Sequence, residues 1–189
     1  MTGTADDSRV RLDCGGCVLR PWREGDEPSL VRHANNREVS RRLRDRFPHP
    51  YTRADAEWWI AFAMHQDPQT QFAIEVDGEA AGGIGLEPGS DIERRTAEIG
   101  YWLGEAVWGR GIATAAVRAV TGYGFEALDL TRVFAVPFAS SSASIRVLEK
   151  CGYVREGTMR RSAIKEGVVI DQVLYALTDE DFARTPPVA

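Results

Sequence analysis

The chain lacks a long apolar run, a secretion signal and an excess of positive charge. No segment approaches the roughly 18 consecutive apolar residues that a membrane-spanning helix needs. Residues 1–7 have neither the basic start nor the apolar stretch of a secretion signal. Asp and Glu outnumber Lys and Arg by 28 to 23, so no overall positive field attracts nucleic acid. We therefore expect a cytoplasmic protein with no membrane partner and no nucleic-acid partner.

Cysteine and histidine are also scarce, with three of each. Cys14 and Cys17 form a single C-x-x-C motif, and neither a second pair nor suitably spaced histidines complete a tetrahedral zinc site. The two glycines between these cysteines indicate a turn that leads into a strand. We expect no metal, with metal or redox chemistry at this pair as the alternative.

The composition that remains is typical of a folded globular domain. Hydrophobic residues make up 43% of the 189 positions, which is too many for a disordered chain. A chain of this length buries enough surface for one core. Residues 1–16 are polar and irregular, and two prolines lie near the end. We therefore predict an N-terminal tail at 1–16, a single domain at 17–182 and a C-terminal tail at 183–189.

Hydrophobic periodicity predicts an α/β (α+β) fold with a mixed sheet. Strands are expected at residues 18–20, 71–76, 80–86, 96–103, 132–136, 153–159 and 168–177. Helices are expected at residues 27–44, from Thr52 to about Ala63, at 113–128, and from the serine run at 140–144 to Gly152. Asp77-Gly78 is a strong hairpin signal, so the strands on either side of it form an antiparallel meander. The sheet is therefore expected to be mostly antiparallel, with helices on its faces.

The join between the strand at 96–103 and the alanine-rich helix predicts an anion site. Gly109 and Gly111 allow the backbone to come close to a ligand, and the first turn of a helix leaves N–H groups without partners. Arg110 adds a positive charge where the helix dipole also favours an anion. The alternative is that the two glycines form an ordinary tight turn.

Two well-known phosphate loops fit this segment less well. A Walker A loop needs a lysine after its last glycine, and none follows Gly111. A dinucleotide fingerprint needs Gly or Ala where Thr114 stands, although Asp129 lies at a suitable distance downstream. That fingerprint also belongs to the first turn of a parallel unit, whereas an antiparallel meander precedes this loop. Nucleotide binding stays an alternative.

Three segments in order resemble the GNAT acetyltransferases, and within them the RimJ/RimL group, which acetylates N-terminal amines of ribosomal proteins. The segments are Tyr101-Trp102-Leu103, Trp108-Gly109-Arg110-Gly111-Ile112-Ala113-Thr114 and Ser144 to Tyr153. The resemblance covers roughly residues 18–177. It implies the GNAT fold, in which the central sheet is splayed at its middle, here between the strands at 98–103 and 132–136, with helices on both faces. It also implies that acetyl-CoA is the cofactor and that no metal takes part.

The resemblance assigns the cofactor to the glycine loop. The family holds the pyrophosphate of acetyl-CoA on a [QR]-x-x-G-x-[GA] loop, which corresponds here to Trp108, Gly109, Arg110, Gly111, Ile112, Ala113 and Thr114. Because Trp108 stands at the Gln/Arg position, the backbone must contact the phosphates. The other expected cofactor contacts are Ile99 and Tyr101, beside the thioester, and Ser141, Ser144 and Arg146.

Glu98, Ser144 and Tyr101 are the candidate catalytic residues. Glu98, beside the thioester, would accept the proton of the attacking amine, directly or through water; its alternative is a surface carboxylate. Ser144 matches the serine of the family's N-x-x-S element, although its asparagine is Ser141 here. It would protonate or bond the leaving sulfur, unless it only caps a helix. Tyr101 is a third acid candidate or a core aromatic, and a backbone N–H near it would stabilise the oxyanion.

The acceptor is expected to be the N-terminal α-amine of a peptide or protein. An α-amine with a pKa near ~8 is roughly one tenth neutral at pH 7, far more than a lysine with a pKa near ~10.4. Such an amine needs only a weak base such as Glu98. The acceptor is expected to lie between the two early helices and the sheet, with Phe47, Tyr51 and Trp59 as walls of its site.

Other acceptors stay open at this point. Arg42 and Arg46 would meet an acidic peptide, or they form a solvated helix face. The stretch 161–164 has no carboxylate where RimL is thought to carry its base. A small-molecule amine (aminosugar, polyamine or antibiotic) is therefore the nearest rival acceptor. A non-catalytic module that binds acyl-CoA is the third reading, and the group also includes homodimers.

Overall fold

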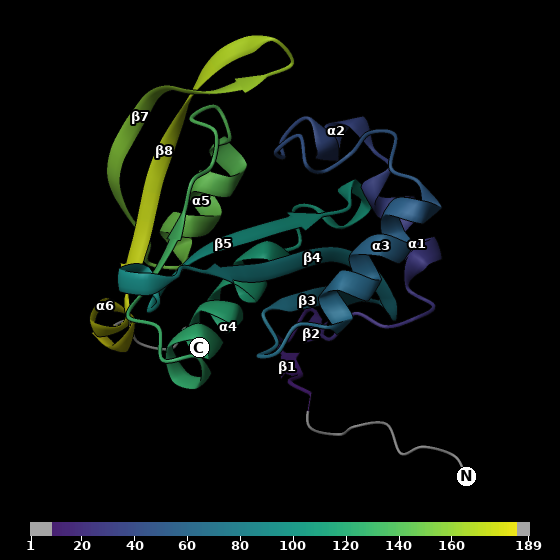
Figure 1. Ribbon diagram of the computed structural model, residues 1–189, viewed down its shortest axis with the longest axis horizontal. Helices are drawn as coiled ribbons and strands as arrows, with labels where there is room; N and C mark the ends of the chain where they lie inside the picture. Colours follow the sequence, from purple (N-terminus) through teal and green to yellow (C-terminus); the bar gives the residue numbers. More distant parts are fainter. Residues whose placement is uncertain (1–8, 185–189) are drawn as a thin grey trace.

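The computed structural model describes residues 9–184, which form one twisted sheet with helices against it (Figure 1). Residues 1–8 and 185–189, parts of the two predicted tails, lie outside the described residues. The sheet has eight strands in the order β1-β2-β3-β4-β5-β6-β8-β7. The strands are β1 (Leu12–Asp13), β2 (Val18–Arg20), β3 (Gln71–Val76), β4 (Glu79–Pro88), β5 (Thr96–Leu103), β6 (Arg132–Ala135), β7 (Val154–Lys165) and β8 (Val168–Thr178).

The helices lie on both faces of this sheet (Figure 1). They are α1 (Glu27–Ala34), α2 (Arg37–Ser40), α3 (Arg53–Met64), α4 (Ile112–Ala127), α5 (Ser142–Lys150) and α6 (Asp179–Arg184). The side chains of β5 alternate between two cores: Ile99 packs with α4 and α5, whereas Trp102 packs with α1 and α3. Within residues 9–184, no helix has the length and apolarity to cross a membrane.

The sheet is mixed and mostly antiparallel, as predicted. Every neighbouring pair among the described strands is antiparallel except β5 and β6, which are parallel. That pairing is short, because it joins only Thr96–Glu98 to Arg132–Phe134. Beyond Glu98, β5 and the β6–β8–β7 strands diverge (Figure 1). The predicted splay is therefore confirmed, and we call this opening the split.

The helix predicted over residues 27–44 is instead two short helices. α1 ends at Ala34, and α2 begins after Asn36, whose side chain accepts a hydrogen bond from the N–H of Glu38 at 2.7 Å. The prediction was wrong because consecutive asparagines bond the backbone locally and interrupt a helix. Residues 41–50 follow as turns and bends, and we call them the arginine loop.

Three predicted boundaries also differ from the structure. β7 runs to Lys165, well past its predicted end, because register shifts against β8 hide the alternation of one long strand. Leu12–Asp13, predicted to lie in a tail, form β1 and pair with β2 across the glycine turn. α6 reaches Arg184 and so overlaps the predicted C-terminal tail.

Candidate active site

The glycine loop is open at the start of α4. Gly109 and Gly111 have left-handed backbones, with φ of +76° and +79°, and a Cβ built on either would meet no atom within 4 Å. No side chain caps the N-terminus of α4. The N–H groups of its first turn have no hydrogen-bond partner within the helix. The loop therefore presents unpaired backbone N–H donors at an open surface, an arrangement that suits an anionic group.

Trp108 and Arg110 flank this loop in different ways. The indole N–H of Trp108 donates to the backbone oxygen of Leu103 at 2.8 Å, and the Arg42 guanidinium lies 5.0 Å from the ring centroid. The Trp108 side chain therefore packs within the protein beside the loop, and the loop backbone is the part that can contact a ligand. Arg110 forms an exposed ion pair with Asp77 at 3.1 Å, at the edge of the same loop.

Tyr101 and Ser144 meet on the α5 side of the split. The two hydroxyls lie 2.8 Å apart, and the Tyr101 hydroxyl also lies 3.3 Å from the backbone oxygen of Ser144. Burial raises the pKa of the Tyr101 phenol and outweighs the hydrogen bond with Ser144, so the phenol stays protonated near neutral pH. The structure therefore brings together two of the three predicted catalytic residues as a hydroxyl pair.

Two further predicted cofactor residues lie at or on α5. Ser141 precedes the first residue of this helix, and its side chain makes no capping hydrogen bond. Arg146 is exposed on the helix surface. Ser144 lies on the same helix, so α5 and the start of α4 supply the α-helical side of the split.

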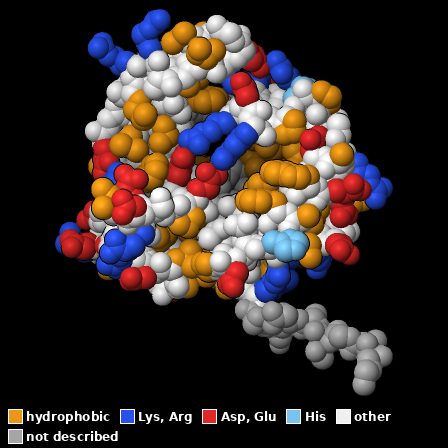
Figure 2. Space-filling model, in the orientation of Figure 1, with side chains coloured by type: hydrophobic (Ala, Val, Ile, Leu, Met, Phe, Trp, Pro, Cys, Tyr) orange, Lys and Arg blue, Asp and Glu red, His pale blue; other side chains and the backbone are white. Residues whose placement is uncertain are grey.

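Glu98 lies on the opposite face of β5 from Tyr101, because side chains alternate along a strand. It is the last β5 residue that pairs with β6, and across the sheet it is the direct partner of Glu87. The arginine loop neutralises this carboxylate pair: Arg44 bonds Glu98, and Arg46 bonds Glu87. Figure 2 shows basic and acidic side chains meeting at the centre of this face.

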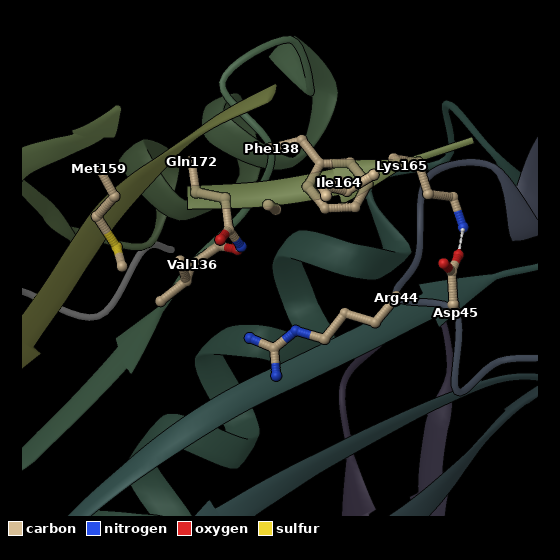
Figure 3. Close-up of a pocket in the computed structure, with 9 residues that line it drawn as sticks. Arg44, Asp45, Val136, Phe138, Met159, Ile164, Lys165 and Gln172 are labelled. Atoms are coloured by element: carbon tan, nitrogen blue, oxygen red, sulfur yellow. Dashed lines mark hydrogen bonds and ion pairs between the residues drawn. The ribbon is translucent and has the colours of Figure 1, made fainter. Parts of the chain in front are cut away.

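A cleft of about 290 Å³ opens next to Arg44, between the arginine loop and the β7–β8 hairpin (Figure 3). Its walls are mostly apolar. The lining residues are Arg44, Asp45, Val136, Phe138, Met159, Ala163, Ile164, Lys165 and Gln172. Lys165 and Asp45 form an ion pair at 2.6 Å that joins the hairpin to the loop. Since Arg44 joins this cleft to Glu98, an acceptor in the cleft would lie beside the split.

The predicted acceptor walls do not line this cleft. Phe47 packs against Tyr51 and Trp102, with ring centroids 5.0 and 5.2 Å apart, and Trp59 meets the edge of Trp22. Tyr51 and Trp22 belong to the buried core between α1, α3 and the sheet, and the other three rings are partly buried against it. Arg44 was not among the residues predicted from the sequence, although the nearby Arg42 and Arg46 were. The one available signal was its place in an arginine-rich segment.

Comparison with known proteins supports the family and the fold. The model of the acetyltransferase (GNAT) domain family matches residues 17–154, more than half of the chain. "Putative ribosomal N-acetyltransferase YdaF" of Bacillus subtilis is 36% identical over 106 residues, covering 56% of this chain and 57% of that protein. Spermidine N(1)-acetyltransferase of Escherichia coli is 29% identical over 96 residues, covering 51% of each chain. The chain thus spans about half the length of these curated relatives.

A solved structure extends the likeness over nearly the whole fold. Mycobacterium smegmatis RimJ, in complex with CoA-disulfide, superposes with a TM-score of 0.78 and 26% identity, covering 92% of this chain and 87% of that one. The RimJ-like resemblance and the splayed fold predicted from the sequence are thereby confirmed. With the matched family model, these findings show that the chain belongs to the GNAT acetyltransferase family.

Proposed function

We propose that the chain transfers an acetyl group from acetyl-CoA to the N-terminal α-amine of a peptide or protein. The observation that carries the proposal is the open glycine loop beside the split. The space above Gly109 and Gly111 would fit a diphosphate, and the split would admit the narrow pantetheine arm. The family resemblance assigns the cofactor to this loop, and the similar RimJ structure is a complex with CoA-disulfide, which supports the proposal.

The cofactor would be held by main chain more than by side chains. The free N–H groups of Ile112, Ala113 and Thr114 would bind the pyrophosphate, with the helix dipole adding to the attraction. Arg110, already paired with Asp77, contributes charge at the edge. When bound, acetyl-CoA supplies an activated acetyl group at the split, next to Ile99 and Tyr101.

The two faces of β5 would divide the proton transfers. On the cleft side, Glu98 would accept the proton that the acceptor amine loses. On the α5 side, the protonated Tyr101–Ser144 pair would donate a hydrogen bond or proton to the leaving sulfur. An α-amine needs only this weak carboxylate base, since part of it is already unprotonated at neutral pH.

A small-molecule amine is the second candidate acceptor. The similarity to spermidine N(1)-acetyltransferase favours it, because that protein's name states a polyamine acceptor. The apolar walls of the cleft favour the peptide instead, since Val136, Phe138 and Met159 would suit the first side chains of a polypeptide.

The test is CoA release from acetyl-CoA with a panel of short peptides, polyamines and aminosugars. We expect turnover of peptides with free N-termini and none of the same peptides with blocked N-termini. If only small amines are acetylated, the peptide proposal is wrong. If calorimetry shows CoA binding but no amine is acetylated, the chain is a binding module and not an enzyme.

A further inference from the structure

Arg44 lines the cleft and also bonds Glu98, the candidate base. Its backbone lies in the arginine loop, and its guanidinium extends away from Asp45 over the β5 ribbon (Figure 3). Its bond to Glu98 joins Nη2 to Oε1. A guanidinium has five N–H donors, so this bond leaves others to face an acceptor. The side chain is 44% exposed, which leaves room for such a contact.

The carboxylates near the cleft are already paired with cations. Asp45 bonds Lys165 at 2.6 Å, Glu98 bonds Arg44, and Glu87 bonds Arg46. A polyamine entering the cleft would therefore meet two cations and would have to displace one from its carboxylate. An acceptor with a carbonyl or carboxylate oxygen near its amine would instead find the donors of Arg44.

Gln172, the uncharged polar side chain of the cleft, is hydrogen-bonded through both its nitrogen and its oxygen. The Gln172 amide donates to the backbone oxygen of Val136 at 3.2 Å and accepts from Ser162 at 3.1 Å. Of the two cations that line the cleft, Arg44 is the one that also bonds Glu98, so it is placed to contact a polar acceptor group beside the base, while Phe138 and Met159 provide apolar contact. This division suits a peptide, which has a side chain and a carbonyl oxygen close to its amine.

We propose that Arg44 determines acceptor specificity. Its guanidinium bridges Glu98 and a carbonyl or carboxylate oxygen of the acceptor, which turns the amine toward Glu98, and its charge excludes polyamines. This inference rests on the proposed function and names its acceptor class: α-amines with an oxygen acceptor nearby, above all peptides with an acidic second residue.

The experiment compares Arg44→Gln with the wild type on two probes, a tetrapeptide with aspartate at position two and spermidine. We expect the variant to raise KM for the peptide about 10- to 100-fold, because a charge-assisted hydrogen bond is lost. The ratio of kcat/KM for peptide over spermidine should fall at least about tenfold. Arg44→Lys, which keeps the charge, should still exclude spermidine but only partly restore the peptide KM.

Arg53→Gln is the matched control, since Arg53 pairs with Glu57 at 2.8 Å on the exposed side of α3, outside the cleft. It should change neither KM nor the ratio. CoA affinity measured by calorimetry should stay the same in all variants, which shows that they fold. If the wild type acetylates the peptide but Arg44→Gln leaves the ratio unchanged, the Arg44 inference is overturned. If the wild type acetylates neither probe, the proposed function fails first.

Discussion

Comparing Gly111→Asp with Gly111→Asn tests whether the glycine loop binds the cofactor phosphates, because the two variants differ in charge and hardly in size. Both side chains would enter open space, since no atom lies within 4 Å of the Cβ position. Both residues would also have to adopt the left-handed backbone conformation of position 111, with φ of +79°, which asparagine and aspartate tolerate better than other non-glycine residues do. The two variants should therefore have similar stability and differ in the charge that faces a bound phosphate.

The size of the charge effect follows from Coulomb's law. Two like unit charges about 4 Å apart, at an effective dielectric constant of about 20, repel by about 4 kcal/mol. Since each 1.4 kcal/mol is about a factor of ten, Gly111→Asp should weaken CoA binding by about 1,000-fold relative to Gly111→Asn.

Isothermal titration with CoA measures this difference, and thermal melting checks that both variants fold. Raising the salt concentration should reduce the difference in CoA affinity between the two variants, because ions screen charges near the surface. Equal affinities for the two variants at low salt would refute the placement of the diphosphate at this loop.

Three further predictions concern the proton path and the fold. Glu98→Gln should lower kcat/KM by about 100-fold or more, with the greatest loss below neutral pH, where the amine is mostly protonated; an unchanged pH–rate profile of CoA release would remove Glu98 from the mechanism. Tyr101→Phe and Ser144→Ala should each reduce kcat, and the double variant should lose little more than the worse single one, because the two hydroxyls act as a pair; fully additive losses would contradict this. Burial opposes ionisation of Glu75, but the hydrogen bond and charge of Arg20 outweigh it and hold its pKa below the usual range. The folded state therefore binds this proton more weakly than the unfolded chain does, so the stabilisation is present above the unfolded pKa of about 4.3 and is lost as pH falls through the folded pKa. Urea midpoints between pH 6 and pH 3 should fall less steeply in Glu75→Gln than in the wild type, and parallel curves would show that Glu75 has no such role.

Arg20, the partner of Glu75, is buried and also pairs with Asp26, so these three residues form an ion-pair network inside the fold. Arg20 is 2% exposed and bonds both oxygens of Asp26, at 2.7 and 2.8 Å. A buried cation of this kind is costly unless its partners stay ionised. The network also fixes the start of α1 against β2 and β3, and so helps to set the position of the arginine loop that follows.

The sequence revealed those parts of the site whose signals are local. The glycine loop was predictable because Gly109, Gly111 and the helix after them are consecutive in the chain. The strand at 96–103 and its meander were predictable because alternation and a hairpin turn are short-range patterns. The hydroxyl pair of Tyr101 and Ser144 needed the family resemblance, since the two residues are 43 positions apart.

The acceptor side was not predictable, because its contacts depend on how distant segments meet. Arg44 and Glu98 are 54 positions apart, and Lys165 and Asp45 are 120 apart. Phe47 is a predicted wall of the acceptor site because it lies near the early helices, and in the structure it is half-buried and packs against Trp102. Phe47 lies in the arginine loop, outside any helix, so helical periodicity carries no information on its burial.

A crystal structure of the chain with CoA would show whether the glycine loop holds the cofactor. We expect the diphosphate to lie within hydrogen-bond distance of the N–H groups of residues 112–114, with the sulfur in the split between β5 and β6. CoA bound at any other surface, or a glycine loop that stays empty at saturating CoA, would contradict this expectation.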